Sequence, residues 1–398
     1  MIDQNRTAQD WLHQGHALRR AAKVIEAEAA YRNAIETDAG LADAYIFLGN
    51  LLQQMKRDAD AEAIFRLGLD RLPAEARLHS SLADLLAVQG QRDEAEALWR
   101  RAVAIDPAYG AAYFGLGGLE AEAGCHEQAE ALYRKAIELS PHLVPAYYSL
   151  SDVLFVLKRH DEAEEVCRRV TDLHPDDPAA WSSLGFLLHS LQRDDEAEQA
   201  FRRAVELAPD LAGDHVNLAN VLVDLGRSDE AVAEYERAAE LDPADARALS
   251  NLGGYLAELG RLAEAEAPLR RAVQVDASHA AAHFNLARLL EELGKHEEAE
   301  AALRKSITLS PTFAQAHFAL CDLLFALKRY DEAEDAIRKV IELEPSNAAA
   351  WHNLGYILHS RKRGRDAEAA YRKALELSPG DARASRNLAA LLSSAALN

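Results

Sequence analysis

A strict repeat of 34 residues constrains this chain more than any other feature. Alanine recurs at this spacing, with no insertion or deletion, at Ala27, Ala61, Ala95, Ala129, Ala163, Ala197, Ala231, Ala265, Ala299, Ala333 and Ala367. Eleven repeats therefore fill residues 8–381 of the 398. Each repeat of this length is one supersecondary unit that buries its apolar face against its neighbours, so a division of the chain by length alone does not apply.

Every repeat predicts a pair of helices. In residues 178–211 the spacing i, i+3, i+4 and i+7 places four residues on one stripe of a first helix: Trp181, Leu184, Gly185 and Leu188. A second helix is expected to begin near Asp194 and to end before Pro209. The small residues Gly185 and Ala197 are expected to lie where the two helix backbones approach each other closely.

The pattern inside the repeat resembles the tetratricopeptide repeat, of the bacterial type. A bulky residue opens most repeats, at Trp11, Tyr45, Tyr113, Tyr147, Trp181 and Trp351. Four residues later stands a small one, at Gly15, Gly49, Gly117, Ser151, Gly185 and Gly355. The resemblance implies an all-α fold: a right-handed superhelical solenoid of antiparallel helix pairs, with a concave groove that holds ligands.

We expect a single elongated domain. Residues 1–7 are interpreted as an N-terminal extension, residues 8–381 as the eleven tandem repeats and residues 382–398 as a C-terminal capping helix. Because this last segment carries few charges, self-association through it is a further expectation. Pro268 falls inside a predicted helix and removes a backbone hydrogen bond there, which predicts a kink or a soft point.

Composition limits the partners. A formal charge of −21 opposes binding to nucleic acid or to anionic lipid. The first residues lack a signal segment and no apolar run is long enough to span a bilayer, so we expect no membrane insertion and a cytoplasmic location. The three cysteines show neither metal spacing nor a disulfide framework. The basic run at residues 361–365 is interpreted as solvated corner charges, with a contact for an acidic partner as the alternative.

Catalytic signatures are missing from the sequence. It contains no phosphate-binding loop, HExxH, CxxC or nucleophile elbow, so we expect no enzymatic activity, no cofactor and no metal. His189 and His359 are expected to point into the groove, but five repeats separate them.

Asparagine dominates the sixth position of the later first helices, at Asn217, Asn251, Asn285, Asn353 and Asn387. This row resembles the asparagine ladder of the O-linked N-acetylglucosamine transferases. An amide donates to a peptide carbonyl and accepts from a peptide N–H, so such a row is suited to an extended backbone. The alternative interpretation is that these amides are only solvated.

Aromatic residues occupy the same predicted face in two blocks, with Phe114, Tyr148, Phe155 and Phe186 in the first and Phe284, Phe318, Phe325 and Tyr356 in the second. Asp152 and Asp322 precede Phe155 and Phe325 by one helical turn. Exposed aromatic clusters mark contact surfaces, which predicts two similar pockets for a basic and hydrophobic segment. The alternative is that these rings fill gaps between neighbouring helices.

These features together predict a non-enzymatic scaffold or adaptor that binds a protein or peptide ligand in its groove. One alternative is a substrate-recognition subunit of a protein-modifying, O-glycosyltransferase-like system. Another is a structural protein that assembles with copies of itself.

Overall fold

The computed structural model describes residues 6–395, and these residues form 23 helices and no strand. The first helices of the repeats are α1 (Ala8–Arg20), α3 (Ala42–Gln54), α5 (Ala76–Val88), α7 (Gly110–Glu122), α9 (Val144–Val156), α11 (Pro178–Ser190), α13 (Ala212–Asp224), α15 (Ala246–Glu258), α17 (Ala280–Glu292), α19 (Ala314–Ala326) and α21 (Ala348–Ser360). The second helices are α2 (Val24–Thr37), α4 (Asp58–Arg71), α6 (Arg92–Ile105), α8 (His126–Leu139), α10 (His160–Leu173), α12 (Asp194–Leu207), α14 (Ser228–Leu241), α16 (Leu262–Val275), α18 (His296–Leu309), α20 (Tyr330–Leu343) and α22 (Gly364–Leu377). The last helix, α23, spans Ala382–Ala395. The predicted all-α repeat solenoid is confirmed.

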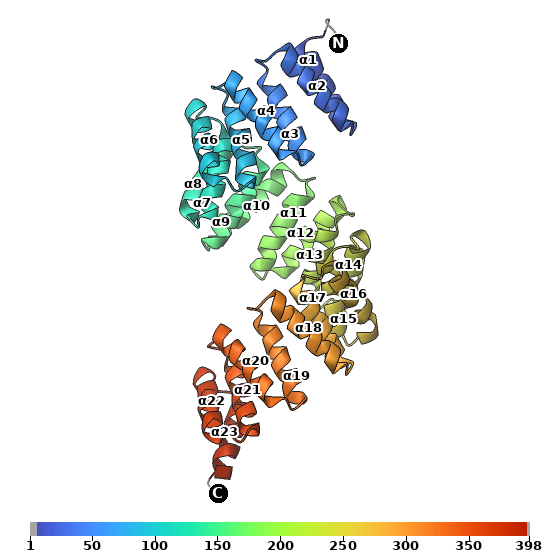
Figure 1. Ribbon diagram of the computed structural model, residues 1–398, viewed down its shortest axis with the longest axis vertical. Helices are drawn as coiled ribbons and strands as arrows, with labels where there is room; N and C mark the ends of the chain where they lie inside the picture. Colours follow the sequence, from blue (N-terminus) through green and yellow to red (C-terminus); the bar gives the residue numbers. More distant parts are fainter. Residues whose placement is uncertain (1–5, 396–398) are drawn as a thin grey trace. The chain divides into compact units, whose positions relative to one another are not determined.

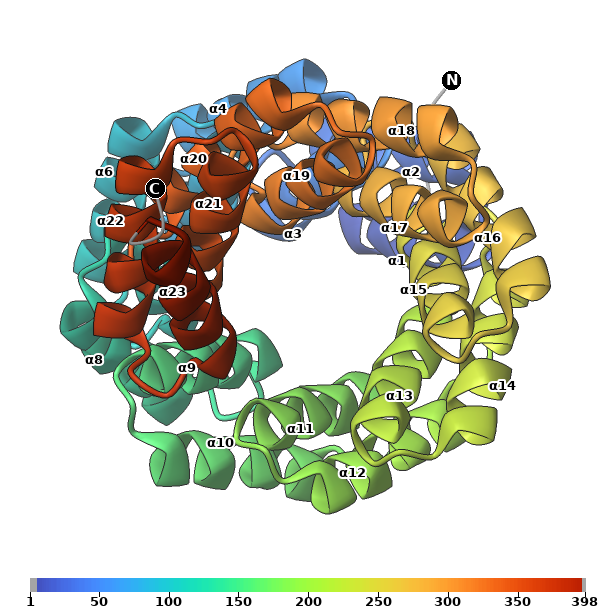
Figure 2. The same ribbon diagram turned by 90° about the horizontal axis from the view of Figure 1, so that it is seen from below.

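The chain divides into two compact parts, an N-terminal unit of residues 1–200 and a C-terminal unit of residues 201–398, with the boundary inside α12. The helices follow one another along the chain in each unit (Figure 1). Within each unit taken by itself, the odd-numbered helices lie on the inner side of the curved stack and the even-numbered helices on its outer side (Figure 2). We call the inner surface the first-helix face. The organisation as a single elongated domain with a capping helix stays a prediction.

The bulky residue that opens a repeat forms a hydrogen bond through its ring, in addition to filling space in the core. The ring of Trp181 donates through Nε1 to the carbonyl oxygen of Pro175, six residues earlier, over 3.0 Å. Equivalent bonds join Tyr45 to Ala39, His79 to Pro73, Tyr113 to Pro107, Tyr147 to Pro141, His215 to Pro209, His283 to Ala277, His317 to Pro311 and Trp351 to Pro345. Each bond ties the loop between repeats to the helix that follows it. In repeat eight the same position holds Leu249, which has no donor.

The small residue four positions later makes room for a ring. A Cβ built on Gly49 would lie 2.3 Å from Phe65 Cε1, and one on Gly355 would lie 2.7 Å from Tyr371 Cδ1. Both rings come from the second helix of the same repeat and are fully buried. At these two positions the glycine accommodates an aromatic side chain in the core, and the close backbone approach expected at Gly185 and Ala197 stays a prediction.

Ion pairs connect most second helices to the next second helix on the outer side. Arg134 on α8 contacts Glu162 on α10 at 2.7 Å, and Arg159 at the start of α10 returns to Glu130 on α8 at 2.6 Å. The forward contact recurs in Arg66–Glu94, Arg168–Glu196, Arg202–Glu230, Arg270–Glu298 and Arg304–Glu332, and the return contact in Arg57–Glu28, Arg193–Glu164, Lys295–Glu266, Arg329–Glu300 and Arg363–Glu334. One exposed pair contributes at most about 1 kcal/mol, but a repeated network also fixes the register between neighbours.

Helix α16 continues through Pro268. The proline has no N–H, so the carbonyl of Glu264 lacks its usual helical partner at this point. The kink or soft point stays a prediction. In the described chain, no helix has the combination of length and apolar character that crossing a membrane requires.

Candidate binding site on the first-helix face

All the predicted site residues lie on odd-numbered helices. In the N-terminal unit, α7 carries Phe114, α9 carries Tyr148, Asp152 and Phe155, and α11 carries Phe186 and His189. In the C-terminal unit, α13 carries Asn217, α15 carries Asn251, α17 carries Phe284 and Asn285, α19 carries Phe318, Asp322 and Phe325, α21 carries Asn353, Tyr356 and His359, and α23 carries Asn387.

Five of these residues meet in one cavity of about 390 Å³ between α19, α21 and α23. They are Asp322, Phe325, Asn353, Tyr356 and Asn387. The remaining lining residues are Cys321, His352, Ile357, Arg383 and Arg386. We call this cavity the Asp322 pocket. It combines aromatic, acidic, amide and basic groups in a space that suits one or two amino-acid residues of a ligand.

Two rings form the apolar wall of the Asp322 pocket. The centroids of Phe325 and Tyr356 lie 5.1 Å apart with their planes tilted by 42°. The ring centroid of Phe325 also lies 5.2 Å from that of Tyr330, a second contact that holds the Phe325 ring in place. Tyr356 is 46% exposed, so its face is accessible to a ligand. The wall therefore combines ring-to-ring packing with one accessible aromatic face.

The carboxylate of Asp322 lies next to this wall. Asn353 Nδ2 donates to Asp322 Oδ1 over 3.1 Å, and in the part of the chain that the structure describes no lysine or arginine pairs with this carboxylate. Partial burial of the carboxyl group, followed by the negative charge of Glu291, raises the pKa of Asp322 to about 6.

The imidazole ring of His352 is buried, and only one of its two nitrogens has a hydrogen-bond partner. His352 is only 7% exposed, and its Nε2 lies 3.0 Å from Asn387 Nδ2. Because an amide nitrogen can only donate, Nε2 accepts this bond, and the neutral ring carries its proton on Nδ1. Burial lowers the pKa of His352, which favours the neutral form. Nδ1 is fully buried and has no hydrogen-bond partner among the described residues, so it is sealed from the cavity and not presented to it.

The corresponding residues of the N-terminal unit are less closely associated. Ser183 stands where the C-terminal unit has Asn353, so Asp152 has no matching amide donor. Phe155 contacts His160 at 5.1 Å, whereas Phe186 is 64% exposed. Burial raises the pKa of Asp152 as well. The prediction of two similar pockets stays untested, and the two sets of residues differ in their amide and aromatic contacts.

Three residues of the asparagine row form hydrogen bonds with other side chains of the protein. Asn285 Nδ2 lies 3.1 Å from Ser250 Oγ on the preceding first helix, and Asn353 and Asn387 donate to Asp322 and His352. A side-chain amide has two N–H groups and a carbonyl oxygen, so each residue keeps capacity for a ligand. These three amides also orient the groups around them.

The other predicted residues have neighbours of their own. Tyr148 donates to Asp177 Oδ2 over 3.5 Å, and burial followed by the Asp177 charge raises the pKa of Tyr148 to about 12. The ring of Phe114 lies 5.7 Å from Tyr133 and that of Phe284 lies 5.0 Å from Phe313. Phe318 packs against the core, His189 Nδ1 lies 2.8 Å from Asp194 Oδ1, and His359 is half-buried in the last turn of α21.

Sequence reasoning missed His352, Arg383 and Arg386. The sequence pattern could have identified them. The second and fifth positions of a first helix are predicted to lie on the first-helix face, and Arg383 and Arg386 hold these positions in α23. His352 holds the fifth position of α21. The basic run at 361–365 is engaged internally, because Arg361 and Arg363 both pair with Glu334.

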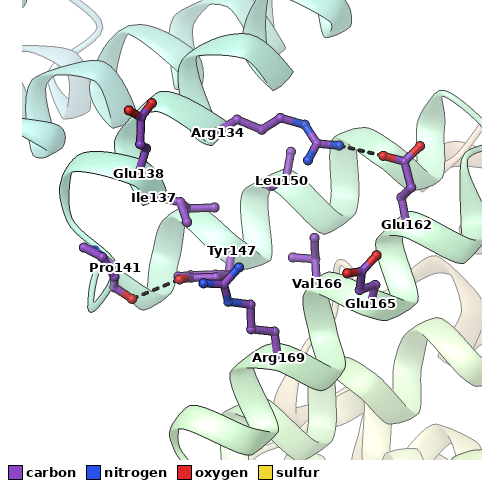
Figure 3. Close-up of a pocket in the computed structure, with 10 residues that line it drawn as sticks. All are labelled: Arg134, Ile137, Glu138, Pro141, Tyr147, Leu150, Glu162, Glu165, Val166 and Arg169. Carbon is purple, nitrogen blue, oxygen red and sulfur yellow. Dashed lines mark hydrogen bonds and ion pairs between the residues drawn. The ribbon is translucent and has the colours of Figure 1, made fainter.

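A second depression lies on the outer side of the N-terminal unit (Figure 3). Its volume is about 390 Å³, and its wall is formed by Tyr147, Ile137 and Val166 beneath the Arg134–Glu162 ion pair. Figure 3 also shows the side chain of Arg169 over the Tyr147 ring, at 5.9 Å from its centroid. These charges are already occupied by the contacts that link neighbouring repeats.

The same outer depression recurs 170 residues later in the C-terminal unit, with a volume of about 510 Å³. His317 and Ala336 replace Tyr147 and Val166 there, and the smaller side chains account for the larger space. The recurrence indicates a feature of repeat packing. It also agrees with the residue echo at this offset that Asp152 and Asp322 show in the sequence.

Comparisons with known proteins agree with this architecture. The family model described as the cilia and flagella-associated protein 70 C-terminal domain matches residues 109–319, and tetratricopeptide repeat models match residues 318–382 and 76–101. No curated protein sequence matches the chain.

Solved structures are similar at low sequence identity. The Cut9–Hcn1 hetero-tetramer of the APC/C has a TM-score of 0.54 at 14% identity, with 97% of each chain covered. PilF of Pseudomonas aeruginosa has a TM-score of 0.49 at 24% identity, covering 53% of this chain and 96% of PilF. YrrB, described as a TPR protein with an unusual peptide-binding site, has a TM-score of 0.40 at 24% identity, covering 48% of this chain and 97% of YrrB.

At these identities the similarity to Cut9–Hcn1 shows the fold alone. The family assignment comes from the model of the cilia and flagella-associated protein 70 C-terminal domain, which spans more than half of this chain. With its uniform repeats, the chain belongs to the tetratricopeptide repeat family, in the group that this C-terminal domain model describes.

Proposed function

We propose that this protein is a non-enzymatic scaffold that binds a segment of another protein on the first-helix face of its C-terminal unit. The tetratricopeptide repeat fold suggests a protein–protein interaction scaffold. The single observation that supports this location is the Asp322 pocket, where five groove residues expected from the sequence gather around one cavity.

The chemistry of the Asp322 pocket fits a peptide. Asn353 and Asn387 offer amide groups for a peptide backbone, and Phe325 with Tyr356 offers an apolar wall for a side chain. The outer depression of Figure 3 is a weaker candidate, because the ion pair above it already links two repeats.

The alternatives raised by the sequence rest on other features. A subunit that presents substrates to a sugar transferase depends on the asparagine row, three of whose members donate to neighbouring side chains or backbone of this chain. Self-association through α23 stays a prediction; Leu392 on this helix is 41% exposed.

The experiment is a pull-down with mass spectrometry from the native cell, with wild type compared against the double variant Phe325→Ala/Tyr356→Ala. Specific proteins retained by wild type should be lost by the variant, since truncating central aromatic contacts costs a few kcal/mol, roughly two or more, of binding free energy. The matched control, Phe155→Ala/Phe186→Ala, removes the equivalent rings of the N-terminal unit and should retain those proteins.

Circular dichroism must show that both double variants remain folded. Unchanged retention by a folded Phe325→Ala/Tyr356→Ala variant would contradict the proposal. Equal loss by both double variants would place the contact outside the Asp322 pocket.

A further inference from the structure

The Asp322 pocket is polarised, and this property goes beyond general peptide binding. Asp322 and the two rings lie on the side of α19 and α21, whereas Arg383 and Arg386 line the pocket from α23. No ion pair joins either arginine to Asp322 in the described residues. The cavity therefore contains an acidic and two basic side chains that are not paired with each other.

A cation is the group that completes the Asp322 end. Asp322 is solvent-exposed, it accepts a hydrogen bond from the neutral amide of Asn353, and no lysine or arginine of the described residues forms an ion pair with it, so its charge is available to an external cation. The rings of Phe325 and Tyr356, 5.1 Å apart, present negative π-faces beside it. Carboxylate and aromatic faces together attract ammonium and guanidinium groups by ion pairing and by the cation–π interaction.

The opposite end requires an acceptor. Arg383 and Arg386 line this end of the pocket from α23, and their guanidinium groups can only donate hydrogen bonds. A peptide carbonyl or a carboxylate group meets this requirement. A single amino-acid residue with a basic side chain carries both complements, its cationic head and its own backbone carbonyl, within the dimensions of a cavity of about 390 Å³.

We propose that the Asp322 pocket binds a lysine or arginine side chain of the partner segment, with Asp322 as its counter-ion and Phe325 and Tyr356 as its aromatic walls. This proposal rests on the proposed function and adds the chemical class of the residue that is recognised. The carbonyl of the same residue faces the arginines of α23, which fixes the direction in which the segment lies.

The test selects a phage-displayed random peptide library on the immobilised full-length chain and measures the affinity of an enriched peptide by fluorescence anisotropy. Enriched peptides should contain lysine or arginine. Replacing that residue by its uncharged analogue, norleucine or citrulline, should weaken binding to wild type by about tenfold or more. Asp322→Asn should weaken binding of the basic peptide and abolish the difference between the two peptides.

Two variants serve as controls. Asp152→Asn changes the equivalent carboxylate of the N-terminal unit and should retain the preference for the basic peptide. Asp322→Glu keeps the charge and should restore part of that preference, which a merely structural role of Asp322 would not do.

Each outcome has a defined meaning. If peptides are enriched and lost by Phe325→Ala/Tyr356→Ala, but bind equally well with norleucine or citrulline, the proposed function stands and the basic-residue proposal is wrong. If Phe325→Ala/Tyr356→Ala retains every enriched peptide, or if no peptide is enriched, both proposals are overturned.

Discussion

The hydroxyl group of Tyr147 donates a hydrogen bond to the carbonyl oxygen of Pro141 over 3.0 Å, as Figure 3 shows. Tyr147→Phe removes this bond and leaves the ring in place. We expect a loss of about 1 kcal/mol in the free energy of unfolding, the usual net contribution of one hydrogen bond. Urea unfolding measures it. Tyr113→Phe, whose bond is 3.3 Å long, should lose less, and an unchanged Tyr147→Phe would contradict this account.

Two adjacent glycines of α7 should respond to alanine in opposite directions. A Cβ at Gly117 would lie 2.7 Å from Tyr133 Cε1, whereas the nearest atom to a Cβ at Gly118 is Tyr133 Oη at 4.0 Å. Gly117→Ala should destabilise the protein by roughly 1–3 kcal/mol through overpacking. Gly118→Ala should stabilise it by up to about 1 kcal/mol because alanine favours the helix. Thermal unfolding measures both, and shifts of the same sign would refute the packing argument.

Stability should depend on pH through Asp322. Partial burial and the Glu291 charge raise the pKa of its folded-state carboxyl group to about 6, above the ordinary value of 3.8. Below pH 3.8 the group is protonated in both states and has no effect on stability. Between pH 3.8 and about 6 the unfolded state releases this proton while the folded state keeps it, so the free energy of unfolding falls over this range and stays at its lower value above pH 6.

Asp322→Asn should therefore stabilise the C-terminal unit at pH 8, by on the order of 1 kcal/mol after solvent screening, and should have little effect near pH 4. The other titratable groups around the site, His352, Arg383, Arg386 and Glu291, are unchanged in this variant. Hydrogen exchange of α19 as a function of pH measures the effect. A gain that is equal at both pH values would show that ionisation of Asp322 is not its source.

Pro268 should limit the stability of α16. Pro268→Ala restores a backbone donor to the carbonyl of Glu264, and we expect a gain of about 1–3 kcal/mol. Slower hydrogen exchange of the α16 amides is the measurement. Pro178→Ala is the control, because Pro178 is the first residue of α11, where proline costs nothing, and it should give no gain.

The sequence predicts the helices well because the same pattern occurs eleven times. The stripe of Trp181, Leu184, Gly185 and Leu188 predicts α11, and the structure begins that helix at Pro178 and ends it at Ser190. Averaging over repeats separates the core positions from those that vary. The varying positions carry the candidate site, and for them the sequence offers one example each.

The details of the Asp322 pocket could not be read from the sequence for this reason. Position nine of a first helix holds Asp322 in one repeat and Tyr356 in the next, and their relation depends on how neighbouring helices pack. The contacts of Asn353 with Asp322 and of Asn387 with His352 depend on how side chains of neighbouring repeats are oriented. The same holds for Tyr147 and the loop carbonyl of Pro141, where the pattern predicts burial but not the hydrogen-bond partner.

The ion pairs between second helices imply that a whole repeat can be removed or added while these contacts are kept. If residues 144–177 were excised, Arg134 would face Glu196 in place of Glu162, and Arg193 would face Glu130 in place of Arg159. Both of these arginines would meet a glutamate at the new junction, since the register of the pairs is the same in the repeats that carry them. The length of such a chain can therefore change by a whole repeat without new surface chemistry, and the residues of the first-helix face remain free to differ from repeat to repeat.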